Sequence, residues 1–590
     1  MIFAALKMNL ESLANEIFLD IFEYLDTIRL FRAFDGLNRR FNALIRTDCR
    51  ECCLDFRRIS KNDFHFFCKE YLPSLVDRVV TWHISDGDET PKLIQSFLSY
   101  PYSSHHFVHL QSLSLYDIGS IDIVIQLIKQ YHRLRHLHLT KFYIIYQEQI
   151  KFPELLNSIW NLPLLVTYCL KSLSTCPELD MEFTVVSTSI KSLIIDDVSL
   201  RCDLLHLFEY TPNLSRLSLD ILRPNMHSLV QTFFPSIVSL DMKLSQSHAP
   251  FNFLSSMPNL THLKFELYGY LVGGHEWERL ITSYLLRLTR LELKMNFSEE
   301  IPKFERTCAQ LLNTFRTPFW LTERQWFVRC VGFFACRDCA IFYTLPYSFD
   351  QIPYRHERWS YSTCSNETIR RSSDHYVKSV EARKEPLHSC EDLHRLTEHY
   401  PNVRHLACHL GNLTNDFCSS RSLVNRLTSM SLVLFDNTWF DQLQTFVDHS
   451  PHLYSLTIVF MLILHKEIFQ LQSSSIRRLS VYCQSLSYGK FKDFSTYECQ
   501  LLANSLLGQR CEVLSIVLQS RFVLLDLLKT MTQLRSINVE FHDDTWQSWY
   551  PLYAPMKIDE HLKWLQNELP SSYSIRRNSK KASFIQIWIG

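Results

Sequence analysis

A short apolar pattern recurs along most of the chain. Each copy has an apolar residue, two variable residues, a second apolar residue, one variable residue and a third apolar residue, as in Leu110, Leu113 and Leu115. Such alternation of apolar and variable positions predicts a β-strand with one buried face. The copies begin at residues 110, 134, 165, 190, 214, 237, 260 and 288, and again at 403, 427, 453, 476, 511 and 534.

The spacing of these copies predicts a stacked array. Most successive copies start 23 to 26 residues apart, which leaves room for one return helix between strands. Proline at positions 212, 258, 401 and 451 stands just before a strand, where it would end that helix. A single strand–helix unit cannot bury its own apolar face, so neighbouring units must stack. We therefore expect an α/β solenoid; an ordinary α/β domain with several Leu-rich strands is the alternative.

The regular pattern fails between residues 297 and 400. Residues 301–400 hold only 7 of the 88 Leu of the chain, and aromatic residues and Cys take their place. Aromatic and β-branched residues favour strands, so we expect two or three strands within residues 324–347. The polar residues 362–392 are typical of an exposed loop. This segment is either a set of irregular repeats or an insertion.

The N-terminal residues have a pattern typical of helices. Ile17, Ile21, Phe22 and Leu25 share one helix face by their spacing, and Asp26 can cap a second helix. Apolar residues within 37–45 predict a third helix, so the module is a three-helix unit. A unit of about 40 residues is close to the smallest size that folds alone. It should therefore pack on the neighbouring domain or offer its apolar face to a partner.

Together these patterns predict five parts. They are a helical module over residues 8–50, a linker and first cap over 51–105, a repeat array over 106–296, the irregular or inserted segment over 297–400, and the second half of the array with a C-terminal cap over 401–590.

Two of these parts resemble known families. The strands are similar to leucine-rich repeats of the longer, helix-backed kind, although the Asn or Cys usual after the strand is mostly missing. Residues 10–26 (LESLANEIFLDIFEYLD) and 38–45 (NRRFNALI) resemble an F-box. Ala14 stands where that family usually has Pro, and Phe41 where it commonly has Trp.

The F-box resemblance implies a partner and a function. F-box modules bind the Skp adaptor of a cullin-RING (SCF-type) ubiquitin ligase, and F-box proteins with leucine-rich repeats commonly act as substrate receptors. The residues that the resemblance assigns to the adaptor contact are Leu10, Leu13, Glu16, Ile17, Ile21, Phe22, Leu25 and Leu30. Two alternatives stay open: these side chains only fill the core of the module, or the protein is a non-ligase repeat scaffold with a degenerate F-box.

A repeat array would offer its outward strand positions to a protein substrate. Those positions alternate with the buried ones and carry mixed charge with His, Arg and Tyr, and Arg and Tyr often anchor protein interfaces. The candidates on the expected concave face are His136, His138, Arg216, Asp220, Asp241, Lys264, Glu292, His405, His409, Arg478 and Tyr482. Taken singly, each could equally belong to a solvated strand face.

Charge argues against a nucleic-acid partner. Lys and Arg number 61, as do Asp and Glu, whereas a general nucleic-acid binder carries a basic excess that neutralises phosphates. The basic run at residues 576–581 is expected to be a solvated turn before an apolar strand at 584–589.

Motifs of catalysis and cofactor binding are absent. The chain has no HExxH, GxSxG, GxGxxG or GxxxxGK[ST], so we expect neither an enzyme nor a cofactor. Cys336 and Cys339 form one CxxC near Cys330 and Cys364. Buried thiols are the simpler interpretation, and a metal or redox site is the alternative.

The sequence also predicts a compartment. The longest apolar stretch, near residues 458–464, is far too short to cross a membrane. The N-terminus lacks the basic region and the cleavage site of a signal peptide. The 18 Cys have no regular spacing, which is typical of reduced thiols. We therefore expect a cytoplasmic and/or nuclear protein without a membrane partner.

Overall fold

The computed structural model describes most of the chain as two compact units. The described residues are 11, 13–48, 51–102, 106–142, 150–172, 179–196, 200–201, 204–221, 233–245, 251–269, 271–298, 304–333, 339–353, 357–366, 377–387, 402–410, 425–434, 440–461, 466–484, 491–542, 544, 559–578 and 583–590. Unit 1 comprises residues 1–176 and 182–197 with Gly590, and unit 2 comprises residues 177–181 and 198–589.

Unit 1 begins with three helices and continues as a parallel sheet. The helices are α1 (Asn15–Phe22), α2 (Thr27–Phe34) and α3 (Arg39–Asp48). The strands that follow are β1 (Cys52–Asp55), β2 (Val79–Ser85), β3 (Ser112–Tyr116), β4 (His136–Phe142), β5 (Thr167–Ser172) and β7 (Ser192–Asp196), paired in that order and all parallel.

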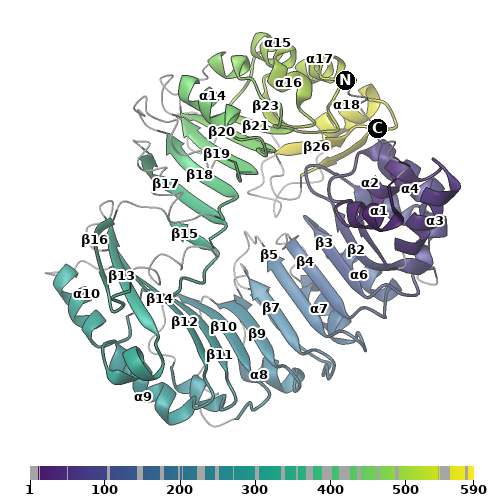
Figure 1. Cartoon of the computed structure of the whole chain (residues 1–590). Coiled ribbons are helices and arrows are strands. Elements are labelled where there is room, and N and C mark those ends of the chain that lie inside the picture. The colour runs from purple at the N-terminus through teal and green to yellow at the C-terminus, as the bar shows by residue number, and fades with distance from the viewer. Residues whose placement is uncertain are drawn as a thin grey trace, which may run out of the picture. The chain divides into compact units, whose positions relative to one another are not determined.

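Return helices connect these strands. They are α4 (Lys61–Glu70), α5 (Leu93–Leu98), α6 (Ile121–Gln130) and α7 (Phe152–Trp160), with short 3-10 turns at Leu72–Ser74 and Val76–Arg78. Figure 1 shows α6 and α7 along one side of β3–β5. Leu137 and Leu139 of β4 are fully buried, as are Val124 and Leu127 of α6. The apolar side of the sheet therefore packs against the helices, as the alternation predicts.

The first strands correct the expected linker over residues 51–105. β1 and β2 with α4 and α5 are further strand–helix units of the same sheet. Val79, Trp82 and Ile84 are buried and have the repeat's own spacing, but the interval of 31 residues to Leu110 separates them from the regular series.

Unit 2 contains two sheets. In the first, β9 (Arg216–Ile221), β10 (Ser239–Ser245), β11 (His262–Tyr268) and β12 (Arg290–Ser298) are parallel. The antiparallel strands β14 (Cys339–Leu345), β13 (Phe327–Phe333) and β16 (Glu357–Ser362) then end it. Its helices are α8 (Leu204–Tyr210), the 3-10 helix η6 (Phe251–Ser256), α9 (Gly274–Tyr284), α10 (Phe304–Asn313) and the π-helix η7 (Phe319–Glu323), and the short strands β6 (Leu179–Asp180) and β8 (Leu200–Arg201) pair separately.

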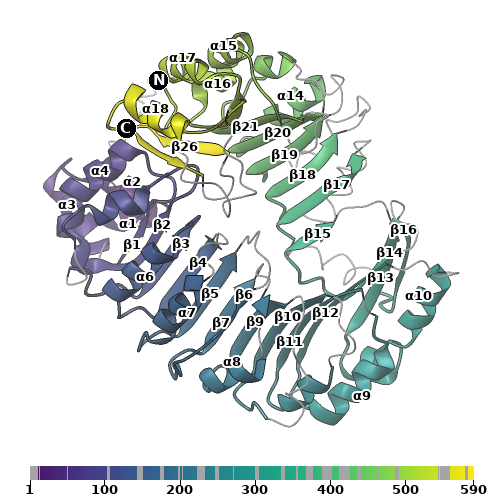
Figure 2. The same cartoon turned by 180° about the vertical axis from the view of Figure 1, so that it is seen from behind.

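The second sheet of unit 2 resumes the parallel order (Figure 2). Its strands are β15 (Gln351–Pro353), β17 (Ser379–Leu387), β18 (His405–Leu410), β19 (Ser429–Leu434), β20 (Ser455–Met461), β21 (Arg478–Gln484), β23 (Val513–Leu518) and β24 (Ser536–Phe541), followed by the antiparallel β26 (Phe584–Trp588) and β25 (Ser574–Arg577), with β22 (Phe491–Lys492) beside β21. Its helices are α14 (Phe440–Asp448), η10 (Lys466–Gln470), α15 (Thr496–Asn504), α16 (Leu506–Arg510), α17 (Arg521–Thr530) and α18 (Glu560–Glu568).

The segment over residues 297–400 is thus the place where the parallel order stops. The two or three strands expected within residues 324–347 are confirmed as β13 and β14. The exposed loop expected at 362–392 is wrong for β17, which pairs in parallel with β18. Val377 and Val380 are fully buried there, and they lie 26 residues before the next copy of the repeat.

Backbone hydrogen bonds join each repeat to the next at the start of the strand. The carbonyl oxygen of Arg135 accepts from the N–H groups of Val166 and Thr167, and the carbonyl of Val166 accepts in turn from Lys191 and Ser192. The same pattern recurs in unit 2, where Val238 accepts from Thr261 and His262. These bonds occupy polar backbone groups that would otherwise be costly to bury. The expected α/β class and its array of strand–helix units are confirmed.

Candidate protein-binding surfaces

The N-terminal module has a core of its own. Phe18 and Phe22 of α1 meet Phe34 of α2 and Phe41 of α3, with ring centroids 4.8 Å apart for Phe18–Phe41 and 5.0 Å apart for Phe22–Phe34. Phe18 was not among the residues that the sequence singled out, although its spacing of four from Phe22 was a usable signal. This aromatic cluster fills the space between the three helices.

The predicted adaptor residues differ in whether they lie in this core or at the surface of the module. Phe22 and Leu30 are 1% and 2% exposed, so both side chains lie in the core of the module, and their contact with an adaptor stays a prediction. Ile17 is 43% exposed, Glu16 is exposed, and the others, apart from Leu10, are half-buried. Leu10 lies outside the described residues.

An apolar surface remains on the module after its core is filled. We call it the α1 stripe, and its members are Leu13, Ile17, Ile21, Tyr24 and Leu25. Tyr24 is 90% exposed and lies in the turn that follows α1, since the helix ends at Phe22; the sequence reasoning did not single it out. Exposed apolar side chains that gather on one face mark interaction sites more often than single ones do.

Hydrogen bonds from Arg40 fix the turn before α1. Its Nε donates to Asn15 Oδ1 over 2.8 Å, and its Nη1 and Nη2 donate to the carbonyl oxygens of Glu11 and Leu13 over 2.5 Å each. Ala14, at the N-cap of α1, has φ −66° and ψ 156°. This φ is the value that a proline ring imposes, so the backbone keeps the conformation expected of the family's usual Pro.

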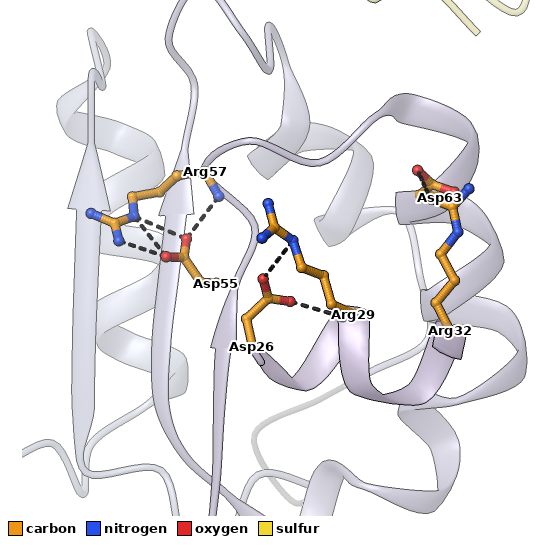
Figure 3. Close-up of polar contacts among 6 residues, drawn as sticks. All are labelled: Asp26, Arg29, Arg32, Asp55, Arg57 and Asp63. Carbon is orange, nitrogen blue, oxygen red and sulfur yellow. Dashed lines mark hydrogen bonds and ion pairs between the residues drawn. The ribbon is translucent and has the colours of Figure 1, made fainter. Parts of the chain in front are cut away.

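Helix α2 docks the module on the first strand–helix unit of unit 1. Arg32 pairs with Asp63 of α4 over 2.9 Å, as Figure 3 shows, and Thr27 Oγ1 donates to the carbonyl of Cys53 over 2.9 Å. Phe31 packs on Tyr71 with a centroid distance of 5.3 Å. The module is therefore held by polar and aromatic contacts on its α2 side.

The polar face of each sheet is the face formed by residues that alternate with the buried apolar ones. In unit 1, parallel register sets His83, Ser114, His138 and Cys169 at one level across β2–β5. His136 lies one level away on β4. His136 and His138, two of the predicted substrate-binding residues, are half-buried on this face.

Burial changes the protonation of two of these imidazoles, His138 and His83. The pKa of His138 is lowered by desolvation and further by the nearby His136, His83 and Lys171. The pKa of His83 is lowered by desolvation, while Asp55 opposes the shift. Both rings therefore favour the neutral form at neutral pH.

The polar face of the first sheet of unit 2 carries carboxylates and amines in alternation. Asp220 lies 3.8 Å from Lys243, and Asp241 lies 3.8 Å from Lys264. Arg216 is exposed, whereas Asp220, Asp241 and Lys264 are half-buried. Such pairs across neighbouring strands are favourable by a few tenths of a kcal/mol, up to about 1 kcal/mol each.

Glu292 differs from its expected place on an open surface. It is 5% exposed, it forms an ion pair with Arg290, and its Oε1 lies 3.4 Å from His262 Nε2. Desolvation raises its pKa, but His262 and Arg290 more than offset this, so the pKa lies below its usual range. The carboxylate of Glu292 is therefore already enclosed by its own neighbours, and its contact with a substrate stays a prediction.

Aromatic residues that follow β14 cover this part of the polar face. The Phe349 ring centroid lies 5.1 Å from Lys264 Nζ and 5.2 Å from Lys294 Nζ. Lys294 in turn pairs with Glu266 over 2.6 Å, and both side chains are less than a tenth exposed. Residues near 347–349 thus bury charges that their strand positions alone would leave open.

The remaining candidates lie in the second sheet of unit 2. His405 is exposed, and Arg478 and Tyr482 are half-buried. The Tyr482 ring lies 6.2 Å from that of Phe584. The side chain of His409 is outside the described residues.

Two further expectations concern charge and thiols. Arg577 is not part of a solvated turn: it pairs with Asp559 over 2.7 Å and with Asp544 over 2.5 Å, and its side chain is 14% exposed.

Cys330 and Cys364 are buried free thiols, while Cys336 lies outside the described residues. Within the described ranges, no group of three or more His, Cys, Asp or Glu could hold a metal ion.

A membrane-spanning helix must be both long and apolar. In the part of the chain that the structure describes, no helix combines the length and the apolar character needed to traverse a bilayer.

Comparisons with known proteins add little. No family model matches the chain, and no curated protein matches it. Among solved structures, the chain is similar to a plant peptide hormone receptor, RGFR1 in complex with RGF2, with 12% identity over 79% of this chain and 90% of that chain and a TM-score of 0.20.

Proposed function

We propose that the protein is the substrate-recognition subunit of a cullin-RING ubiquitin ligase of the SCF type. In this proposal the N-terminal module binds the Skp adaptor, and the polar faces of the strand arrays bind a protein target. The subunit would have no active site of its own. It would act by holding target lysines near a ubiquitin-carrying enzyme, since positioning alone can supply a large rate gain.

The observation that carries the proposal is the α1 stripe. The aromatic cluster already fills the interior of the module, yet Ile17 and Tyr24 stay 43% and 90% exposed. Burying a side chain of this size at an interface is worth about 1.5–3 kcal/mol. These side chains lie in the segment that resembles an F-box, so a Skp-type adaptor is the partner that fits them.

The docking through α2 supports the same proposal. The contacts of Arg32 and Phe31 lie on the side of the module that faces α4, whereas Ile17 and Tyr24 keep their exposure. The module could therefore bind an adaptor while it stays attached to the first strand–helix unit.

Reconstitution tests the proposal. The full chain would be mixed with purified Skp adaptor and a cullin–RING pair and separated by size-exclusion chromatography. Co-elution of all components is the expected result. Elution of the chain apart from the adaptor would contradict it.

A non-ligase scaffold with a degenerate F-box is the second candidate. Burial of Phe22 and Leu30 favours it, because these two residues, which the resemblance assigns to the adaptor contact, lie in the core of the module. The same chromatography separates the two candidates, since a scaffold of this kind would not co-elute with the adaptor.

A further inference from the structure

We infer that the polar face of β2–β5 in unit 1 binds an anionic segment of a partner protein, through a cluster that we call the histidine patch: His83, His136, His138 and Lys171. The inference rests on the proposed function only in treating the array as a recognition surface. It assigns the chemistry of the partner, which the proposed function leaves open.

Register brings the members of the patch together. His83 and His138 stand at one level on either side of Ser114, and neighbouring strands are about 4.8 Å apart, so the two side chains begin about 10 Å apart. Ser114, between them on β3, is only 3% exposed. The patch is thus a row of imidazoles on neighbouring strands with a small residue between them.

Hydroxyl groups surround the imidazoles. Ser112 and Thr167 stand at the level of His136, and Thr140 stands at the level of Lys171. Hydroxyls can donate to an anion without bringing a charge of their own. The donors of this face therefore suit carboxylate or phosphate oxygens.

The charge balance of the patch favours an anion. The positive or protonatable groups are Arg57 beside β1, His83, His136, His138 and Lys171. Among the described residues, the carboxylates near them are Asp55 and Asp196, and the other titratable neighbours are Tyr116 of β3 and the thiols of Cys53 and Cys169.

Both carboxylates already have a cationic partner. Asp55 accepts two bonds from Arg57 Nε, over 2.9 and 3.1 Å, and a third from Nη2 over 2.5 Å, and Asp196 lies 3.5 Å from Lys171. Once the imidazoles are protonated, positive charge exceeds negative charge among the residues of this face that the structure describes. An acidic segment would restore the balance.

Protonation then couples to binding. Burial and the neighbouring positive groups lower the pKa of His138, and burial lowers that of His83. A bound anion stabilises the charged imidazolium, so binding takes up protons and tightens as the pH falls. The affinity should change by up to about tenfold per pH unit for each imidazole that must be protonated.

Two acidic probes test the inference on the full chain. One is a fluorescent peptide with a run of Glu, and the other is a peptide of the same length with phosphoserine among Gln. A Gln-only peptide is the control ligand. Fluorescence anisotropy would be followed between about pH 8 and about pH 6, the range in which imidazoles titrate.

Variants connect the binding to the patch. His138→Gln with His83→Gln should abolish most of the pH dependence, and Lys171→Gln should weaken binding but keep its pH dependence. His132→Gln is the matched control, because His132 is an exposed imidazole outside the patch. If the double variant fails to fold, the His138→Gln and Lys171→Gln single variants carry the test.

The outcomes are distinct. Binding of either acidic probe that tightens at low pH and depends on the patch supports the inference, and the better probe tells carboxylate from phosphate. No binding at about pH 6, or binding that His138→Gln leaves unchanged, overturns it. Adaptor binding is measured on the same preparations, so failure of the ligase proposal is seen separately.

Discussion

At the scale of single residues, Arg40 is the side chain that most determines how α1 begins. It donates hydrogen bonds to Asn15 and to two backbone carbonyls, and its guanidinium carbon lies 5.4 Å from the centroid of the Phe18 ring. The planar fork of Arg can reach several acceptors at once, which an ammonium on a flexible stem does less well.

Replacing Arg40 should loosen the turn before α1. Arg40→Ala is expected to lower the local stability of α1 by about 1–2 kcal/mol, since partly exposed charged hydrogen bonds are worth less than buried ones. Arg40→Lys should recover only part of this loss. Hydrogen exchange of the α1 amides would measure it, with the exposed Arg39→Ala as the control. Equal exchange in Arg40→Ala and wild type would refute the role.

Ala14 is a position at which a substitution should increase the stability of the module. Its φ of −66° already suits proline, so Ala14→Pro should stabilise the module by about 0.4–1 kcal/mol by restricting the unfolded chain. Ala14→Gly should destabilise it by a similar amount. Slower exchange of the α1 amides in Ala14→Pro is the expected result. Faster exchange would mean that the preceding residue cannot accommodate a proline.

At the scale of elements, the C-terminal cap depends on Arg577 of β25. This side chain bonds Asp559 through two of its nitrogen atoms, over 2.7 and 2.8 Å. Asp559 also caps α18 by accepting from the N–H of Leu562 over 3.0 Å. One guanidinium thus ties the final hairpin to the start of the last helix.

The cap should therefore be sensitive to acid. Burial raises the pKa of Asp559, but hydrogen bonds from Arg577 and from the N–H of Leu562 more than offset it, so the folded pKa lies below its usual value. The resulting stability is complete above the unfolded pKa and is lost as the pH falls through the folded pKa. Exchange of the α18 amides should accelerate in that acidic range, and Asp559→Asn should remove the acceleration.

Removing the guanidinium should weaken the cap at neutral pH as well. Arg577→Leu is expected to cost about 2–3 kcal/mol of local stability, because it leaves partly buried carboxylates without their partner. Arg576→Gln, which alters one hydrogen bond to Gln586, should cost about 1 kcal/mol or less. Comparable losses in the two variants, measured by exchange of the α18 amides, would contradict the assignment to Arg577.

At the scale of the whole molecule, alternation along the chain predicts most of the strands. Each of the copies that begin between Leu110 and Leu534 corresponds to a strand, because a period of two decides which side chains face the helices. The copies that begin at Val79 and Val377 were not predicted. The first lies 31 residues before Leu110, outside the regular spacing, and the second lies among polar residues.

The candidate sites were less predictable for a physical reason. Alternation predicts that Glu292 and Lys264 lie on the polar face of their sheet. It does not predict which other residues cover that face. Phe349 reaches Lys264 and Lys294 from the segment after β14, and no local pattern encodes such a contact. In the N-terminal module, helical spacing placed Phe22 on the same face as Ile17, whereas packing divided them between core and surface.

The central claim is that the α1 stripe binds a Skp-type adaptor, and isothermal titration of the full chain with purified adaptor tests it most directly. Ile17→Asp with Tyr24→Asp alters only exposed positions of the stripe, and Val186→Asp with Leu286→Asp is the matched control at exposed apolar positions elsewhere. We predict that wild type and control bind alike and that the stripe variant binds at least about 100-fold more weakly, a loss of about 2.7 kcal/mol. Absence of binding by the wild type, or equal binding by the stripe variant, would contradict the account.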